Sequence, residues 1–127
     1  MRMSPERAKQ QYLEQQVASA TPERLLTMLY DRLLVDIDRA AIAQAAGEWT
    51  DAASHLLHAQ QIVAELNATL TDAWHGSADL RGLYTYLGGR LIVANVGRDQ
   101  TATAECRDIV GPLRDAWHEA SLTSSPV

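Results

Sequence analysis

The sequence is poor in the residues that support disulfide-linked, aromatic-cored or membrane-spanning proteins. Its 127 residues include one cysteine, Cys106, and no phenylalanine. One cysteine excludes an intrachain disulfide, and the core must be built mainly from leucine, isoleucine, valine, alanine and methionine. No apolar run approaches the ~18 residues of a membrane-spanning helix, and the N-terminus shows no signal-peptide pattern. These absences predict a cytoplasmic location.

Basic residues and helix breakers are also scarce. Lys+Arg 11 against Asp+Glu 16 gives a net charge of −5, which argues against a surface for nucleic-acid phosphates. With 7 Gly and 4 Pro in a chain rich in alanine and leucine, helix is favoured throughout. No strand-like alternation competes with the helical periodicity, and the length fits one domain.

Four helical segments are predicted, each with a Ser or Thr cap and the first three with a glycine stop. Pro22 suits the first helical position of the first segment. With caps and stops included, the predicted segments are Thr21–Gly47, Thr50–Gly76, Ser77–Gly97, and a last one from Thr101 or Thr103 through Trp117 toward Leu122.

Short connections between these segments make consecutive helices antiparallel. The predicted fold class is therefore all-α, an antiparallel up-down four-helix bundle with a flexible N-terminal arm. Gly111-Pro112 predicts a kink or break in the last helix. The predicted parts are an arm over residues 1–20, a bundle over 21–122 and a disordered tail over 123–127. Gly88-Gly89, inside the third segment, is either a tolerated defect or a place where another backbone approaches closely.

No catalytic or metal-binding constellation is recognisable. No Glu has a His three residues later, so the di-iron pattern of helical bundles is missing. His55 and His58 share a helix face without an obvious third ligand, which favours an exposed pair. Asp-Ala-Trp-His occurs at residues 72–75 and again at 115–118, where local Asp–His pairing is expected. Cys106 is expected to be a small buried side chain. We therefore predict no enzymatic activity, no cofactor and no metal.

The remaining signal is an excess of apolar surface. The third segment carries Tyr84 and Tyr86, and its far side adds Ile92. The first carries Met28 and Tyr30 outside its main leucine stripe. A helix that is apolar nearly all round is either central or covered. A groove for amphipathic partner helices, thicker packing under the arm and a homodimer interface all fit this pattern.

Four blocks of sequence, in order, resemble the FliS family of flagellar secretion chaperones. They are Tyr12, Val17, Ala20-Thr21-Pro22, Leu25 and Met28-Leu29-Tyr30-Asp31; then Ala59-Gln60, Ile62, Glu65-Leu66 and Leu70; then Leu83-Tyr84, Tyr86, Leu91 and Ala94-Asn95; then Leu113-Arg114-Asp115-Ala116-Trp117. The resemblance implies a cytoplasmic export chaperone that binds the C-terminal segment of flagellin. It further implies that binding prevents premature polymerisation and supports delivery to the flagellar type III secretion apparatus. The export gate would be a second partner, with no nucleic acid and no membrane insertion.

Partner-binding residues carried over from this resemblance are Tyr12, Val17, Met28, Leu29, Tyr30, Asp31, Leu83, Tyr84, Tyr86, Ala94 and Asn95. The arm residues among them, Tyr12 and Val17, would cover part of the groove when flagellin is absent. Asp31 and Asn95 are expected to be hydrogen-bonded, to each other or to backbone. Gly88-Gly89 and Gly111-Pro112 depart from the family's pattern. The alternative is a homodimeric helical scaffold or adaptor without flagellin specificity.

Overall fold

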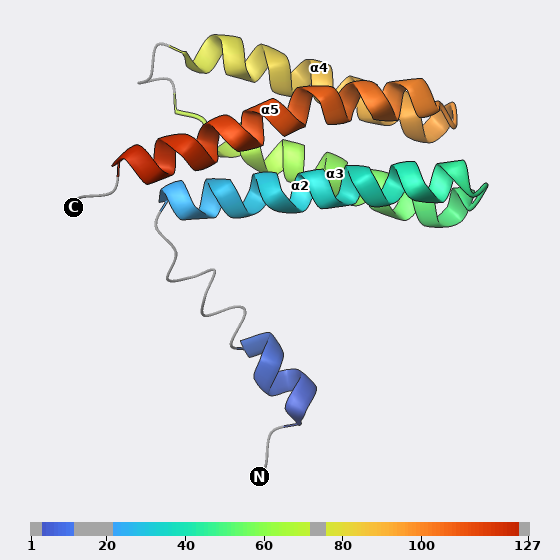
Figure 1. Cartoon of the computed structure of the whole chain (residues 1–127), viewed down its shortest axis with the longest axis horizontal. Coiled ribbons are helices and arrows are strands. Elements are labelled where there is room, and N and C mark those ends of the chain that lie inside the picture. Colours follow the sequence, from blue (N-terminus) through green and yellow to red (C-terminus); the bar gives the residue numbers. More distant parts are fainter. Residues whose placement is uncertain (1–3, 12–21, 72–75, 125–127) are drawn as a thin grey trace.

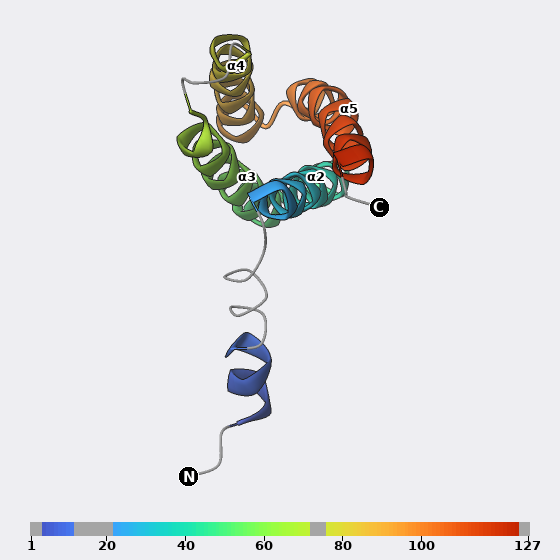
Figure 2. The ribbon, with the colours of Figure 1, turned by 90° about the vertical axis from the view of Figure 1, so that its left-hand side faces the viewer.

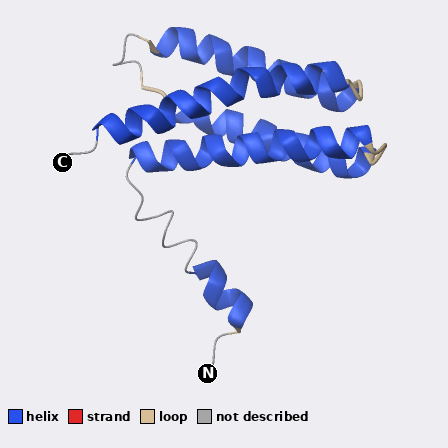
Figure 3. Ribbon diagram, in the orientation of Figure 1, coloured by secondary structure: helices blue, strands red, loops and turns tan. Residues whose placement is uncertain are grey.

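The computed structural model describes residues 4–11, 22–71 and 76–124. All regular secondary structure in these ranges is helical (Figure 3). A short helix over residues 5–11 precedes four long ones, α2 (Pro22–Ala45), α3 (Trp49–Thr69), α4 (Ser77–Val96) and α5 (Gln100–Ser124) (Figure 1). The predicted all-α class is confirmed. Within the described ranges, no helix has the length and apolarity needed to cross a membrane.

The four long helices enclose a common interior. α2 packs against α3 and α5, and α4 packs against the same two helices. The end-on view shows that they close into a ring (Figure 2). In Figure 1 the chain runs along the long axis in α2 and back in α3, and then out again in α4 and back in α5. Each helix therefore has one face toward the interior and one toward solvent.

The interior is aliphatic, as the absence of phenylalanine predicts. Every long helix contributes residues that are almost completely buried, among them Leu33, Leu56, Leu91 and Val110. Each such side chain contributes on the order of 2 kcal/mol through removal of apolar surface from water. Cys106 is buried as predicted, and its burial raises the pKa of the thiol to about 12.

Glycines end two of the helices where the sequence predicts it. α2 ends just before Gly47, which has a φ of 72°, a conformation that costs glycine little. α4 ends just before Gly97, but the left-handed residue there is Arg98, with a φ of 49°. α3 ends at Thr69, earlier than predicted, because Leu70 is extended. The first predicted cap, Thr21, lies outside the described residues.

The other predicted caps are wrong. α3 begins one residue before Thr50, and no side chain caps it. Ser77 lies inside the first turn of α4, where its hydroxyl donates to the carbonyl of Thr71. α5 is capped by Asp99, whose Oδ1 accepts the Ala102 N–H at 3.1 Å. The carboxylate suits the positive end of the helix dipole better than either threonine that follows it.

α5 continues through Gly111-Pro112, so of the predicted kink or break, the break is absent. Proline removes only one backbone hydrogen bond. Val110 is buried before the proline, and Leu113 packs against the core after it, which holds both halves in place. Figure 1 shows the axis of α5 bending along its length. The helix reaches Ser124, inside the predicted tail, whereas residues 125–127 lie outside the described part.

Candidate partner-binding site

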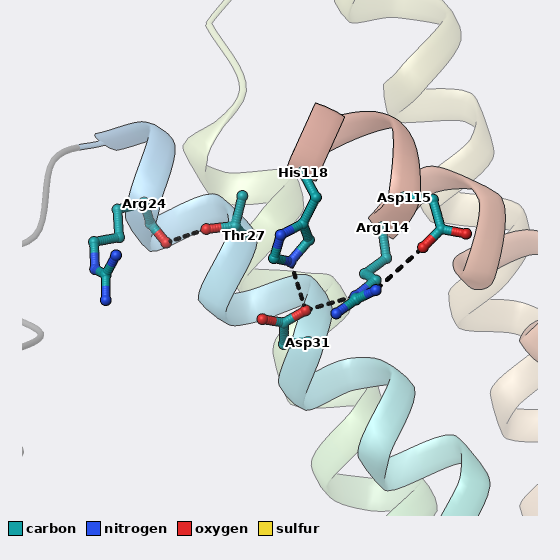
Figure 4. A network of polar contacts seen from close by, with 6 residues as sticks. All are labelled: Arg24, Thr27, Asp31, Arg114, Asp115 and His118. Carbon is teal, nitrogen blue, oxygen red and sulfur yellow. Dashed lines mark hydrogen bonds and ion pairs between the residues drawn. The ribbon is translucent and has the colours of Figure 1, made fainter. Parts of the chain in front are cut away.

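Asp31, on α2, accepts hydrogen bonds from two side chains of α5, Arg114 and His118 (Figure 4). Its Oδ1 accepts from Arg114 Nε at 2.7 Å and from His118 Nε2 at 2.8 Å. Arg114 also donates to Asp115 at 3.2 Å. The expected bonding of Asp31 to Asn95 or to backbone is therefore wrong, and so is the expected local pairing of Asp115 with His118. These contacts form because α2 and α5 pack side by side. The i, i+3 spacing of Asp115 and His118 within α5 does not predict them.

These two hydrogen bonds also change how Asp31 titrates. Partial burial raises the pKa of its carboxyl, but the hydrogen bonds from Arg114 and His118 outweigh that effect, and the pKa lies below its ordinary value of 3.8. A folded-state pKa below the unfolded one means that the ionised form stabilises the fold. This stabilisation is fully present above the ordinary pKa and is lost as the pH falls through the lowered one.

We expect Asp31→Asn to lower Tm by only a few degrees at neutral pH, because partly exposed ion pairs contribute little. Thermal melts followed by circular dichroism, from about pH 7 down to about pH 2.5, should show the difference from wild type shrinking as Asp31 is protonated. Asp115→Asn is the control, since its carboxylate accepts a hydrogen bond from Arg114 and its side chain is 73% exposed. A difference that stays constant across the acidic range would contradict this assignment.

A second carboxylate, Asp36, is completely buried between α2 and α3. Its Oδ2 accepts a hydrogen bond from His58 Nδ1, and its Oδ1 lies 3.4 Å from Arg32 Nε without a hydrogen-bond partner. His58 therefore joins two helices and is not half of an exposed pair, while His55 lies near Asp51. In the part of the chain that the structure describes, no group of three or more His, Cys, Asp or Glu side chains is placed to hold a metal ion.

Two of the predicted site residues, Tyr30 and Tyr84, lie in the interior. Their hydroxyls hydrogen-bond to each other, and Trp117 stacks on Tyr30 with ring centroids 6.2 Å apart and planes at 24°. Burial raises the pKa of both tyrosines, so both stay protonated at neutral pH. This cluster joins α2, α4 and α5 within the core.

The other predicted residues that the structure describes differ in their exposure. Tyr86 is 51% exposed, and its hydroxyl donates to Glu105 of α5. Ala94 is completely buried. Tyr12 and Val17 lie outside the described residues. The half-buried ones are Met28, Leu29, Asp31, Leu83 and Asn95. Ala94 is thus part of the core, whereas Tyr86 is exposed on α4.

A groove of about 430 Å³ lies between α3 and α4. Its lining residues are small or apolar for the most part: Gln60, Val63, Ala64 and Asn67 from α3, with Tyr84, Thr85, Gly88, Gly89 and Ile92 from α4. A Cβ added at Gly88 would meet only Val63 Cγ1, at 3.9 Å, and one added at Gly89 would meet nothing within 4 Å. The glycine pair is thus not explained by close approach of another backbone in this structure. It keeps the groove open.

Exposed apolar side chains extend this groove along both helices. Ile92 is 50% exposed, Leu57 52% and Val96 81%. Leu57 precedes Ala64 by two helical turns and Val96 follows Ile92 by one, so each shares a face with a lining residue. The term α3–α4 groove below covers the lining residues together with Leu57 and Val96. The residues of α3 that line this groove were not predicted from the sequence. Their signal in the sequence is a set of small or apolar residues at helical spacing, next to the residues that α3 buries in the core.

The family model described as "Flagellar protein FliS" matches residues 5–124. The chain belongs to the FliS family. It is 37% identical over 109 residues to the flagellar secretion chaperone FliS of Bacillus subtilis (strain 168), over 86% of this chain and 82% of that protein. It is 29% identical over 116 residues to the flagellar secretion chaperone FliS of Escherichia coli (strain K12), over 89% and 85% of the two chains.

The fold agrees with FliS membership. A crystal structure of a bacterial flagellar chaperone matches with a TM-score of 0.74 at 17% identity, over 95% of this chain and 100% of that one. At this identity the match shows a common fold. Together with the family match, it confirms the resemblance found in the sequence and supports a chaperone role in flagellar export.

Proposed function

We propose that this FliS protein binds the C-terminal segment of flagellin in the cytoplasm, prevents its premature polymerisation and supports its delivery to the flagellar type III secretion apparatus. The chaperone role follows from the family. The finer proposal is supported by one observation in particular, the apolar α3–α4 groove with its exposed rim. In this proposal an antiparallel up-down bundle over residues 21–122 presents the groove, and the protein acts by binding, without catalysis.

The dimensions and chemistry of the groove suit an amphipathic helix. Packed helices lie about 8–10 Å apart, and small residues at the contact allow the closer distances. Ala64, Gly88 and Gly89 are such residues, and they lie where a docked helix would cross. Leu57, Ile92 and Val96 would lose contact with water on docking, at roughly 25 cal/mol per Å² of apolar area. A segment that folds as it docks loses conformational entropy, and this cost offsets part of the free energy gained by burying apolar area. Such a segment therefore binds through a long contact with modest affinity per unit area.

Titration calorimetry with a synthetic flagellin C-terminal peptide tests the proposal. We expect a 1:1 complex with a negative heat-capacity change, because apolar surface is buried. A scrambled peptide of equal composition is the control and should not bind. Absence of binding by the native peptide would refute the proposal. A stable dimer in light scattering that the peptide does not dissociate would favour the homodimeric scaffold instead.

The N-terminal arm, residues 1–20, is proposed to cover part of the groove through Tyr12 and Val17 until flagellin arrives. Deletion of residues 1–17 should then leave the helices folded by circular dichroism and raise the affinity for the peptide, because a competing segment is gone. The export gate would receive the loaded complex. Unchanged affinity after the deletion would remove the arm from this account.

A further inference from the structure

A second recess, of about 390 Å³, lies where α3 begins and α4 ends. It continues the α3–α4 groove, because Ala53 lies one turn before Leu57 on α3 and Val96 lies one turn after Ile92 on α4. Its apolar lining is Ala52, Ala53, Leu56 and Val96, and its other lining residues are Gln44, Trp49, Thr50, Asn95 and Arg98. It is referred to below as the Trp49–Arg98 recess.

The lining of this recess carries a cation and no carboxylate. The guanidinium carbon of Arg98 lies 5.2 Å from the centre of the Trp49 ring. The acidic residues nearest in sequence, Glu48, Asp51 and Asp99, are not among its lining residues. Asp99 caps α5, and Glu48 and Asp51 line a different recess that contains Arg39. Arg98 is therefore the one charged residue among the lining residues of this recess, and its guanidinium favours an anionic group on the ligand.

The same lining is rich in hydrogen-bond donors. The guanidinium, the Trp49 indole, the Asn95 amide and the Thr50 hydroxyl all carry N–H or O–H groups. Gln44, in contrast, is already satisfied, since its amide donates to the Ala94 carbonyl at 3.2 Å and its Oε1 accepts from Thr103 at 2.7 Å. The carboxyl end of a docked helix would complement these donors. It has unpaired backbone carbonyls, which accept hydrogen bonds, and it is the negative end of the helix dipole.

Two tight turns hold the recess in shape. The Glu48 N–H donates to the Ala43 carbonyl at 2.8 Å, and the Asp99 N–H donates to the Ala94 carbonyl at 3.0 Å. The second turn requires the left-handed conformation of Arg98 and so fixes the start of its side chain. A site whose groups are already ordered loses little entropy when a ligand binds.

We propose that the Trp49–Arg98 recess receives the carboxyl end of the segment that docks in the α3–α4 groove. The terminal carboxylate of that segment pairs with the Arg98 guanidinium, and its last apolar side chain packs against Leu56 and Ala53. The inference rests on the proposed function and adds a direction to it. The bound segment runs with its C-terminus toward the beginning of α3.

Two forms of the same peptide test this direction, one with a free C-terminal carboxylate and one with a C-terminal amide. Wild-type protein should bind the free acid about tenfold more tightly in calorimetry at low salt, because a charge-assisted pair is lost on amidation. Arg98→Gln should bind both forms equally, and Arg98→Lys should keep part of the preference. Arg107→Gln is the matched control, since it removes the same charge from an arginine that pairs with Asp38 at 2.7 Å, and it should keep the full preference.

The possible failures are distinguishable. Equal binding of both forms by wild type would overturn the direction while leaving the proposed function intact. Failure of both forms to bind would refute the proposed function itself. A third peptide carries an aspartate near its end and a C-terminal amide. If it binds wild type as tightly as the free acid does, and binds Arg98→Gln more weakly, Arg98 pairs with a side-chain carboxylate. That result would also overturn the proposal.

Discussion

Ala64→Glu is expected to lower the affinity for the flagellin segment about 100-fold, or roughly 2.7 kcal/mol. Ala64 is an exposed residue on the α3 wall of the groove. The free variant should therefore fold normally, because its new carboxylate lies in water. A docked apolar helix would remove that carboxylate from water without offering a partner, and this desolvation is costly.

Calorimetric titration of wild type and variant with the same peptide measures this loss. Ala104→Glu is the matched control, because Ala104 is also exposed and helical but lies on α5. It should bind as wild type does. Equal affinity of the Ala64 and Ala104 variants would remove the α3–α4 groove from the binding surface.

His58→Ala is expected to lower the free energy of unfolding by about 3 kcal/mol. The substitution removes the hydrogen bond to Asp36 Oδ2 and leaves a fully buried carboxylate whose Oδ1 already lacks one. The Arg32 Nε, at 3.4 Å from Oδ1, would stay beside this carboxylate without a hydrogen bond to it. Urea denaturation at neutral pH measures the change.

His55→Ala is the control for that experiment, because its partner Asp51 has a side chain 58% exposed and keeps its water when the imidazole is removed. Its effect should stay within about 0.5 kcal/mol. Asp36→Leu in the His58→Ala background should restore much of the lost stability, since the unpaired charge is gone. Equal effects of the two histidine substitutions would show that the burial of Asp36 adds nothing to the stabilisation by its histidine partner.

The fold is largely predictable from this sequence because its strongest signals are local. Pro22 begins α2, and Gly47 and Gly97 follow the ends of α2 and α4 as their positions suggest. The caps are less predictable, since Asp99 competes with the threonines after it and a carboxylate is the stronger cap in this position. Pro112 predicts a kink or a break from local geometry alone, whereas packing on both sides of the proline keeps α5 continuous.

The candidate site is much less predictable because it depends on which helices are neighbours. Asp31 and His118 are 87 residues apart, and Asp36 and His58 are 22 apart. Neither pair leaves a signal at helical spacing. Apolar patterning likewise does not separate Tyr84, which is buried, from Ile92, which is exposed, because α4 is apolar toward both the core and the groove. The packing of α3 against α4 is what places Tyr84 in the core and Ile92 at the groove.

The amide spectrum of ¹⁵N-labelled protein, recorded by NMR during titration with the flagellin C-terminal peptide, tests the central claim most directly. The account predicts shift changes along both walls of the α3–α4 groove, from Leu57 to Asn67 and from Thr85 to Arg98. The face around Asp31 and Arg107, where α2 meets α5, should change little. Changes concentrated on that face, with the groove amides unmoved, would contradict the account.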